Sequence, residues 1–173
     1  MACNLTQDIE LGCRDSKGGI KRVYIAQLEH KNTLTVSSGT VGTFTLTAGN
    51  QFWVYDFRKQ TGNAVENGTG STENGTFFYE QTVTFPIDKM QASLREELSL
   101  LAQNRVMVIV LDRNGKYHLF GKDNGLDLNT LEANTGTAMG DRNGYTLTFN
   151  GAEEDMAPEV DSSLISTLTA PAS

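Results

Sequence analysis

The chain has 173 residues and a formal net charge of −7, with 14 Lys and Arg residues against 21 Asp and Glu residues. Its longest basic run is Lys21-Arg22, so it lacks the clustered positive charge with which proteins grip nucleic acids tightly. An acidic surface along which DNA slides without sticking remains compatible with this balance. The length favours one domain with an ordinary core, and the abundance of Thr, Asn and Gly suits strands joined by tight turns.

The N-terminal segment, residues 1–19, is polar and lacks the apolar run of a secretory signal. Its two cysteines, Cys3 and Cys13, are therefore expected to be reduced thiols of a cytosolic product, and a short-loop disulfide is the alternative. No stretch of the sequence approaches the roughly 20 apolar residues of a membrane span, so we expect none.

Strands dominate the first half of the chain. Alternating apolar and polar residues predict strands at 20–28, 34–37 and 41–47. The next segment, 51–59, is aromatic: Phe52 and Val54 oppose Trp53, Tyr55 and Phe57. Apolar groups on both faces predict a buried or interface strand.

Residues 60–75 change character, because Asn, Gly, Thr, Ser and Glu dominate and the apolar residues are Ala64 and Val65. Alternation returns at 76–85, where Phe77 and Tyr79 share one side. We therefore predict a hairpin of two aromatic strands joined by a long, polar, mobile loop at 60–75. Loops longer than about 12 residues are uncommon unless they are functional or disordered, so simple disorder is the alternative.

The second half begins with Pro86, which suits the first turn of a helix, and apolar residues at spacings of three and four predict an amphipathic helix at 87–103. The strand that follows is apolar on both faces, as expected for a strand between the helix and other strands. Its turn, Asn114-Gly115, is typical of a hairpin. The later predicted segments are strands at 105–111, 116–121 and 145–150, repeated turns at 123–144, and a flexible or docking C-terminal tail at 156–173 beyond a β domain at 1–155.

The sequence offers no constellation for chemistry. His30 and His118 do not stand at metal-ligand spacing with Cys, Asp or Glu, and a Gly-x-Ser-x-Gly nucleophile signature is absent. The segment from Asp123 to Asp127 resembles part of a calcium loop but lacks its terminal Glu. We therefore expect no metal, no cofactor and no enzymatic activity.

Turn and strand-end motifs then follow in order through the chain: Cys13-Arg14-Asp15, Glu73-Asn74-Gly75-Thr76-Phe77-Phe78-Tyr79, Leu101-Ala102-Gln103-Asn104-Arg105, Asn114-Gly115-Lys116-Tyr117, Phe120-Gly121, Asn124-Gly125-Leu126 and Gly140-Asp141-Arg142-Asn143-Gly144-Tyr145. In this order the chain resembles the tail tube (major tail) proteins of tailed bacteriophages. The resemblance covers most of the chain.

The resemblance implies a mainly β fold, an antiparallel β-sandwich or barrel with one flanking α-helix and a long hairpin loop. It implies a virion structural protein, made in the bacterial host cytoplasm, that self-assembles into stacked, hexameric rings through which DNA passes without specific binding, together with other phage tail proteins. The candidate subunit-contact residues of the loop are Thr61, Asn63, Val65, Asn67, Thr69, Ser71, Glu73 and Asn74. The candidate core or interface aromatics are Trp53, Tyr55, Phe57, Phe77 and Tyr79.

Two other functions stay open. A capsid decoration or head–tail connector protein would also be structural. A carbohydrate-binding β-sandwich would need exposed aromatic side chains on one face, which Trp53, Tyr55 and Phe57 could supply, although the two-sided apolar pattern of their strand favours burial.

Overall fold

A computed structural model describes residues 4–173 of the chain. Cys13 is exposed. Cys3 lies outside the described residues, so the prediction that both thiols are reduced stays a prediction.

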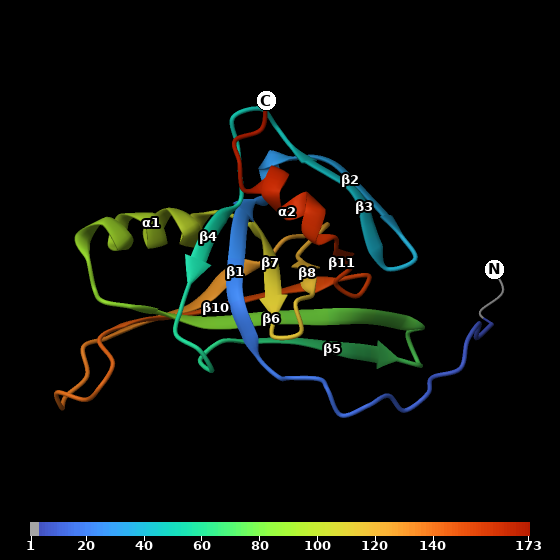
Figure 1. Cartoon of the computed structure of the whole chain (residues 1–173), viewed down its shortest axis with the longest axis horizontal. Coiled ribbons are helices and arrows are strands. Elements are labelled where there is room, and N and C mark those ends of the chain that lie inside the picture. The colour runs from blue at the N-terminus through green and yellow to red at the C-terminus, as the bar shows by residue number, and fades with distance from the viewer. Residues whose placement is uncertain (1–3) are drawn as a thin grey trace.

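The chain forms two packed β-sheets, mostly antiparallel, flanked by two helices (Figure 1). The mainly β sandwich with a flanking helix is confirmed, and the sheets do not close into a barrel. The larger sheet has the order β2-β3-β11-β8-β7-β1-β4, and the smaller has the order β5-β6-β10-β9. The strands of the larger sheet are β1 Ile20–Gln27, β2 Lys31–Ser37, β3 Thr40–Leu46, β4 Trp53–Asp56, β7 Val106–Asp112, β8 Tyr117–Phe120 and β11 Glu159–Val160. The smaller sheet contains β5 Asn63–Ser71, β6 Thr76–Asp88, β9 Asp127–Asn134 and β10 Gly144–Glu153; a 3-10 turn (Leu28–His30) and the helices α1 Ala92–Gln103 and α2 Ser162–Leu168 complete the fold.

The main core lies between the two sheets and is closed at one end by α1. Val83 and Phe85 of β6 and Leu147 and Phe149 of β10 are fully buried against one face of β1, β7 and β8. The rings of Phe85 and Phe149 are stacked, with their centroids 5.9 Å apart. Burial of side chains of this size is the main stabilising term of the fold.

A second core covers the opposite face of the larger sheet, where the β2–β3 hairpin and α2 pack over β1 and β7. Met107 and Ile109 point into this core, while Val108 and Val110 point into the first. The predicted two-sided burial of this strand is confirmed, because strand neighbours alternate between faces.

The predicted loop at 60–75 is wrong. Residues Asn63–Ser71 form strand β5, which pairs with β6 over its whole length, from Asn63 opposite Thr84 to Ser71 opposite Thr76. A short turn at 72–75 closes this hairpin. The segment has weak strand propensity, but a neighbouring strand supplies all its backbone hydrogen bonds on one side, and that pairing outweighs composition.

The predicted pairing of the two aromatic strands is also wrong, because they lie in different sheets. β4 pairs with β1, whereas β6 pairs with β5 and β10. The helix begins at Ala92 rather than at residue 87, because Ile87 and Asp88 still pair with β10. Lys89 has a positive φ of 67° and turns the chain between strand and helix.

Two further segments differ from expectation. The predicted turn region 123–144 contains β9, which pairs with β10 from Asp127 to Asn134. The C-terminal tail was predicted to be either flexible or docked, and it is docked. Strand β11 lies between β3 and β8, and Ile165 and Leu168 of α2 are buried in the second core.

Candidate assembly surfaces

The smaller sheet ends in two unused edges. In the part of the chain that the structure describes, β5 pairs with β6 on one side and β9 pairs with β10 on one side. All pairings in this sheet are antiparallel, so its four strands alternate in direction and the edge strands β5 and β9 run opposite to one another. Free edges are templates for pairing with another chain.

The two faces of this sheet differ sharply in character. Its inner face carries the apolar residues of the main core, and its outer face carries the alternate residues. Hydroxyl and amide side chains dominate the outer face, and Thr84 and Thr148 lie with their Oγ1 atoms 3.3 Å apart. The outer acids include Glu80 and Glu132, and the four strands contain no Lys or Arg. The guanidinium of Arg142, from the loop before β10, donates to Thr146 Oγ1 on this face at 2.6 Å. The face is therefore polar, and the charges that its own strands contribute are acidic.

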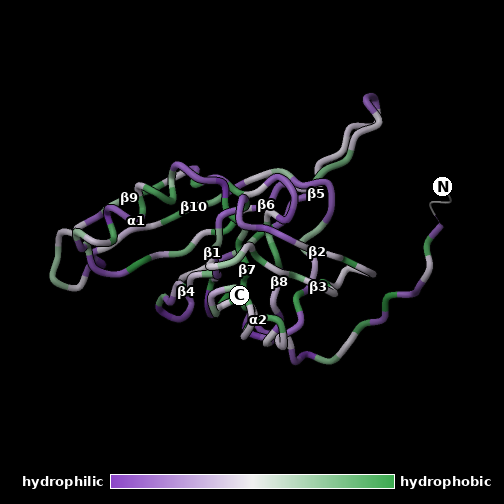
Figure 2. The backbone as a smooth tube through the Cα atoms, turned by 90° about the horizontal axis from the view of Figure 1, so that it is seen from above, coloured by the Kyte–Doolittle hydropathy of each residue, from purple (hydrophilic) through white to green (hydrophobic). Residues whose placement is uncertain are grey.

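The distal half of the β5–β6 hairpin projects from the body as an arm, residues 67–80, with a hydrophilic tip (Figure 2). Its inner face continues the inward row of the sheet beyond the core. There the ring of Phe77 lies over Gly68 and Gly70, where an added Cβ atom would come within 2.8 Å of that ring. Phe77 packs edge-on against Tyr79, with ring centroids 5.2 Å apart, yet remains 62% exposed. The arm thus carries an apolar patch that its own chain leaves open.

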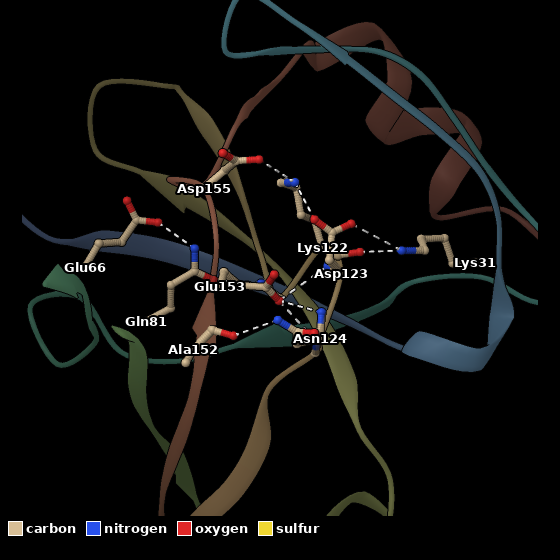
Figure 3. A network of polar contacts seen from close by, with 11 residues as sticks. Lys31, Glu66, Gln81, Lys122, Asp123, Asn124, Ala152, Glu153 and Asp155 are labelled. Carbon is tan, nitrogen blue, oxygen red and sulfur yellow. Dashed lines mark hydrogen bonds and ion pairs between the residues drawn. The ribbon is translucent and has the colours of Figure 1, made fainter. Parts of the chain in front are cut away.

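A buried glutamine fixes the root of the arm to the body (Figure 3). The Oε1 atom of Gln81 accepts a hydrogen bond from the backbone N–H of Gly121 at 2.8 Å, and its Nε2 atom donates to Glu66 at 2.9 Å. Glu66 also accepts from the backbone N–H of Ala157 at 2.7 Å. Three separate parts of the chain are therefore joined where the hairpin leaves the sandwich.

Next to this root, the buried carboxylate of Glu153 holds the loop before β9 (Figure 3). Its Oε1 atom accepts from the backbone N–H groups of Asp123, Asn124 and Gly125 at 3.3, 2.9 and 3.2 Å. Its Oε2 atom is buried without a hydrogen-bond partner among the described residues. Burial raises the pKa of Glu153 above its ordinary value, although these three donors oppose the shift.

Ion pairs surround the same loop. Lys122 pairs with Asp123 and with Asp155, the latter at 3.1 Å, and Lys31 lies 3.8 Å from Asp123. The Lys122 side chain is largely buried, whereas its two carboxylate partners are exposed. These pairs bring β2 and the segment after β10 to one loop.

A groove of about 280 Å³ lies between the C-terminal half of α1 and strands β1 and β4. Trp53 and Tyr55 line one side, and Glu97 and Leu100 of α1 line the other. Trp53 is 60% exposed and Leu100 is 52% exposed. Burial raises the pKa of Tyr55 to about 12, and the nearby carboxylate of Glu97 adds to the shift.

The predicted contact residues of 60–75 come together on one surface. Asn63, Val65, Asn67, Thr69 and Ser71 share the outer face of β5, while Thr61 precedes the strand and Glu73 and Asn74 lie in its turn.

The predicted aromatics divide into three environments. Phe57 stacks on Phe85 of the main core, Tyr55 is half-buried, and Trp53 is exposed because β4 is an edge strand. Burial on both faces was therefore wrong for Trp53. Phe77 and Tyr79 lie on the arm.

Sequence reasoning missed the second edge of the sheet, because β9 carries the polar sequence Asp-Leu-Asn-Thr-Leu-Glu-Ala-Asn. Leu128, Leu131 and Ala133 share its inward side across a bulge, and this irregular spacing hides the strand signal.

Within residues 4–173, no cluster of three or more His, Cys, Asp or Glu side chains is arranged to hold a metal ion. Over the same range, no helix has the length and apolar character needed to cross a membrane. No protein-family model matches the chain, and neither a curated protein nor a solved structure does so.

Proposed function

We propose that this chain is a self-assembling structural subunit of a virion, whose copies form the stacked rings of a phage tail tube. The observation that carries the proposal is the four-stranded sheet, which combines two free edges, an apolar inner face and a polar outer face whose strands contain acids but no Lys or Arg. A sheet with these properties is suited to be one segment of a larger shared wall.

Ring closure follows from strand direction. Copies related by rotation about a common axis keep the same orientation, so β5 of one copy meets β9 of the next. These two strands run in opposite directions, and their pairing continues the antiparallel ladder without interruption. The contact is heterologous, and a heterologous contact that closes gives a ring with no unpaired edge.

The dimensions suit a conduit. In a hexameric ring, four strands from each copy give about 24 strands, and at about 4.8 Å per strand the perimeter is about 115 Å. The corresponding diameter is about 37 Å between backbones, an open channel rather than a filled barrel. With the outer face of the sheet toward this channel, DNA meets mainly neutral hydroxyl and amide groups and carboxylates. The carboxylates repel phosphates, and the scarcity of cations allows passage without tight binding.

The arm supports stacking of one ring on another. It projects along the strands, beyond the body, and carries the uncovered Phe77 and Tyr79. A neighbouring ring, or another tail protein at the end of the tube, would cover this patch. The protein then resides in the virion tail after synthesis in the bacterial host cytoplasm.

The direct test is negative-stain microscopy and light scattering of the purified chain. Rings or tubes are expected, and a monomer that persists at high concentration would overturn the proposal. A decorated capsid shell or a head–tail junction as the sole binding partner would favour the alternative structural roles.

A charge variant tests the shared wall itself. Asn63→Asp adds an acid on the outer face of β5, where β9 of the next copy brings Asp127 and Glu132. Like charges across strands destabilise pairing by roughly 0.2–1 kcal/mol, so assembly should weaken, most clearly at low salt. The matched control Asn32→Asp makes the same change at an exposed position of β2, in the other sheet. Equal effects of the two variants would contradict the proposed edge contact.

A further inference from the structure

The N-terminal segment, residues 4–15, carries a strand pattern that its own chain leaves unused. Apolar or thiol side chains occupy four of the five odd positions from 5 to 13, with Gln7 as the exception, whereas every even position from Asn4 to Arg14 is polar, charged or glycine. The apolar or thiol residues are Leu5, Ile9, Leu11 and Cys13. This period of two is the signature of a strand with one apolar face.

The structure leaves that face in solvent. Residues 4–13 are in no helix or strand, and Leu5, Ile9 and Leu11 are 99%, 95% and 103% exposed. Anchoring begins only at Ser16 and Lys17, which bond to Asn114 in the β7–β8 turn. Three large apolar side chains at fixed parity, all exposed, indicate a segment that pairs with a sheet edge elsewhere.

The free edge of β4 fits such a strand best. On the face that borders the groove against α1, this edge carries the side chain of Trp53, which is 60% exposed; Val54, 45% exposed, lies on the opposite face. The edges β5 and β9 already belong to the proposed ring contact. A strand added beside β4 would place alternate side chains over Trp53 and Leu100.

The charges are compatible with this placement. With Ile9 and Leu11 over the groove, Asp8 and Glu10 fall on the opposite face of the sheet. There Arg22 of β1 is half-exposed and shares its guanidinium with Asp56 at 2.6 Å.

The segment runs away from the acceptor edge of its own chain. From the start of β1, which lies beside β4, it extends toward the end where the arm projects, whereas α1 lies toward the other end of the longest axis (Figures 1 and 2). Extended, residues 4–15 span about 40 Å, enough to cross from one copy to the next. The direction of the segment therefore favours a second copy over its own chain.

We propose that residues 4–15 of one copy add as a strand to the free edge of β4 in a second copy and seat Ile9 and Leu11 in the groove between β4 and α1. The inference rests on the assembly proposed above and names a second contact that links stacked rings. The occupant of the groove is thus a segment of the same protein.

Trp53, the chain's single tryptophan, reports occupancy of the groove. The acceptor is the full-length chain with L5S, I9S and L11S, whose own segment is disabled, and the probe is a synthetic peptide of residues 4–15. A saturable blue shift of Trp53 emission is expected, and a peptide with the same three serines should give none. No shift up to about 1 mM peptide, or equal shifts with both peptides, overturns the proposal. A shift produced by glycans and not by the peptide also overturns it.

An assembly assay distinguishes failure of this strand contact from failure of the proposed tube function on which it rests. The triple variant L5S, I9S and L11S is compared with the matched variant T6S, D8S and E10S, which alters the polar side of the same segment. The apolar triple should raise the critical concentration of tubes at least tenfold, and the polar triple less than threefold. Tubes that form equally well in both refute the strand contact and leave the tube function standing, whereas a wild-type chain that never assembles refutes the function.

Discussion

The exposed ring of Phe77 offers a direct measure of what the arm contributes to assembly. Phe77→Ala removes a side chain that is 62% exposed in the single chain, so the folded monomer loses little. Within the chain, the variant loses only the edge-on contact of the Phe77 ring with Tyr79 and its contacts with Gly68 and Gly70. Cross-strand contacts of this kind contribute about 0.2–1 kcal/mol, and thermal unfolding of the monomer should shift by only a few degrees.

Assembly should respond far more strongly. With an aromatic side chain of about 200 Å², the exposed part of Phe77 amounts to roughly 120 Å², and covering it fully is worth up to about 3 kcal/mol at about 25 cal/mol per Å². Covering half of that area corresponds to about 1.5 kcal/mol, or about a tenfold change in the association constant.

Sedimentation across a concentration series measures the critical concentration of wild type and variant. Val36→Ala, which truncates a 41% exposed residue of β2 in the other sheet, is the matched control. The reasoning on the arm is refuted if Phe77→Ala and Val36→Ala assemble at the same concentration as the wild type.

Three further predictions concern the body of the protein. Because the pKa of Glu153 is raised in the folded state, its contribution to stability is complete below the unfolded pKa of about 4.3 and is lost as pH rises through the folded value. Glu153→Gln should therefore flatten the dependence of unfolding free energy on pH across that range in denaturant titrations, and an unchanged slope would contradict the burial of this carboxylate. Gly144→Ala should cost about 3 kcal/mol in denaturant unfolding, because a Cβ atom would collide with the backbone carbonyl of Ile87, whereas Gly140→Ala has open space and should be nearly neutral. Gln81→Met should cost about 2 kcal/mol by the same measurement, because it leaves a buried backbone N–H without an acceptor, and a loss below about 0.5 kcal/mol would argue against the hydrogen bond.

The strands of the buried core were predictable because their apolar side chains follow the periodicity of a strand. Val23 and Ile25 alternate with Tyr24 and Ala26, and the structure places the two sets in the two cores. The apolar strand from Val106 to Asp112 was equally clear, since burial on both faces requires apolar residues at every position.

The edge strands of the smaller sheet, β5 and β9, were not predictable, because an edge strand with one solvated face needs little apolar character. In β5, the inward positions are Ala64, Glu66, Gly68 and Gly70, small or polar residues that carry no strand signal. Five of the eight candidate contact residues fall on one face of this strand, an alignment that the predicted loop did not imply. Composition indicated a loop, and pairing with β6 decided otherwise.

The sequence also did not indicate which strands pair with the two aromatic strands, β4 and β6. β4 and β6 are separated by one strand in the chain, and short connections favour neighbours within a sheet. Here the chain crosses from one sheet to the other after Phe57, whose ring stacks on Phe85 at 5.7 Å and bridges the two. Such a crossing is set by packing of side chains distant in sequence, which local periodicity does not encode.

The placement of the unused surfaces constrains the kind of assembly that the chain can form. A two-fold dimer buries the same patch on both partners, so one interface would have to contain the N-terminal segment and the groove of each partner together. The arm and the N-terminal segment instead extend toward one end of the molecule, away from α1 (Figures 1 and 2). The edges β5 and β9 are likewise two different surfaces on opposite sides of one sheet. Both pairs of surfaces therefore suit the proposed heterologous contacts, one around an axis and the other along it, and it is the second contact that would extend the proposed ring into a tube.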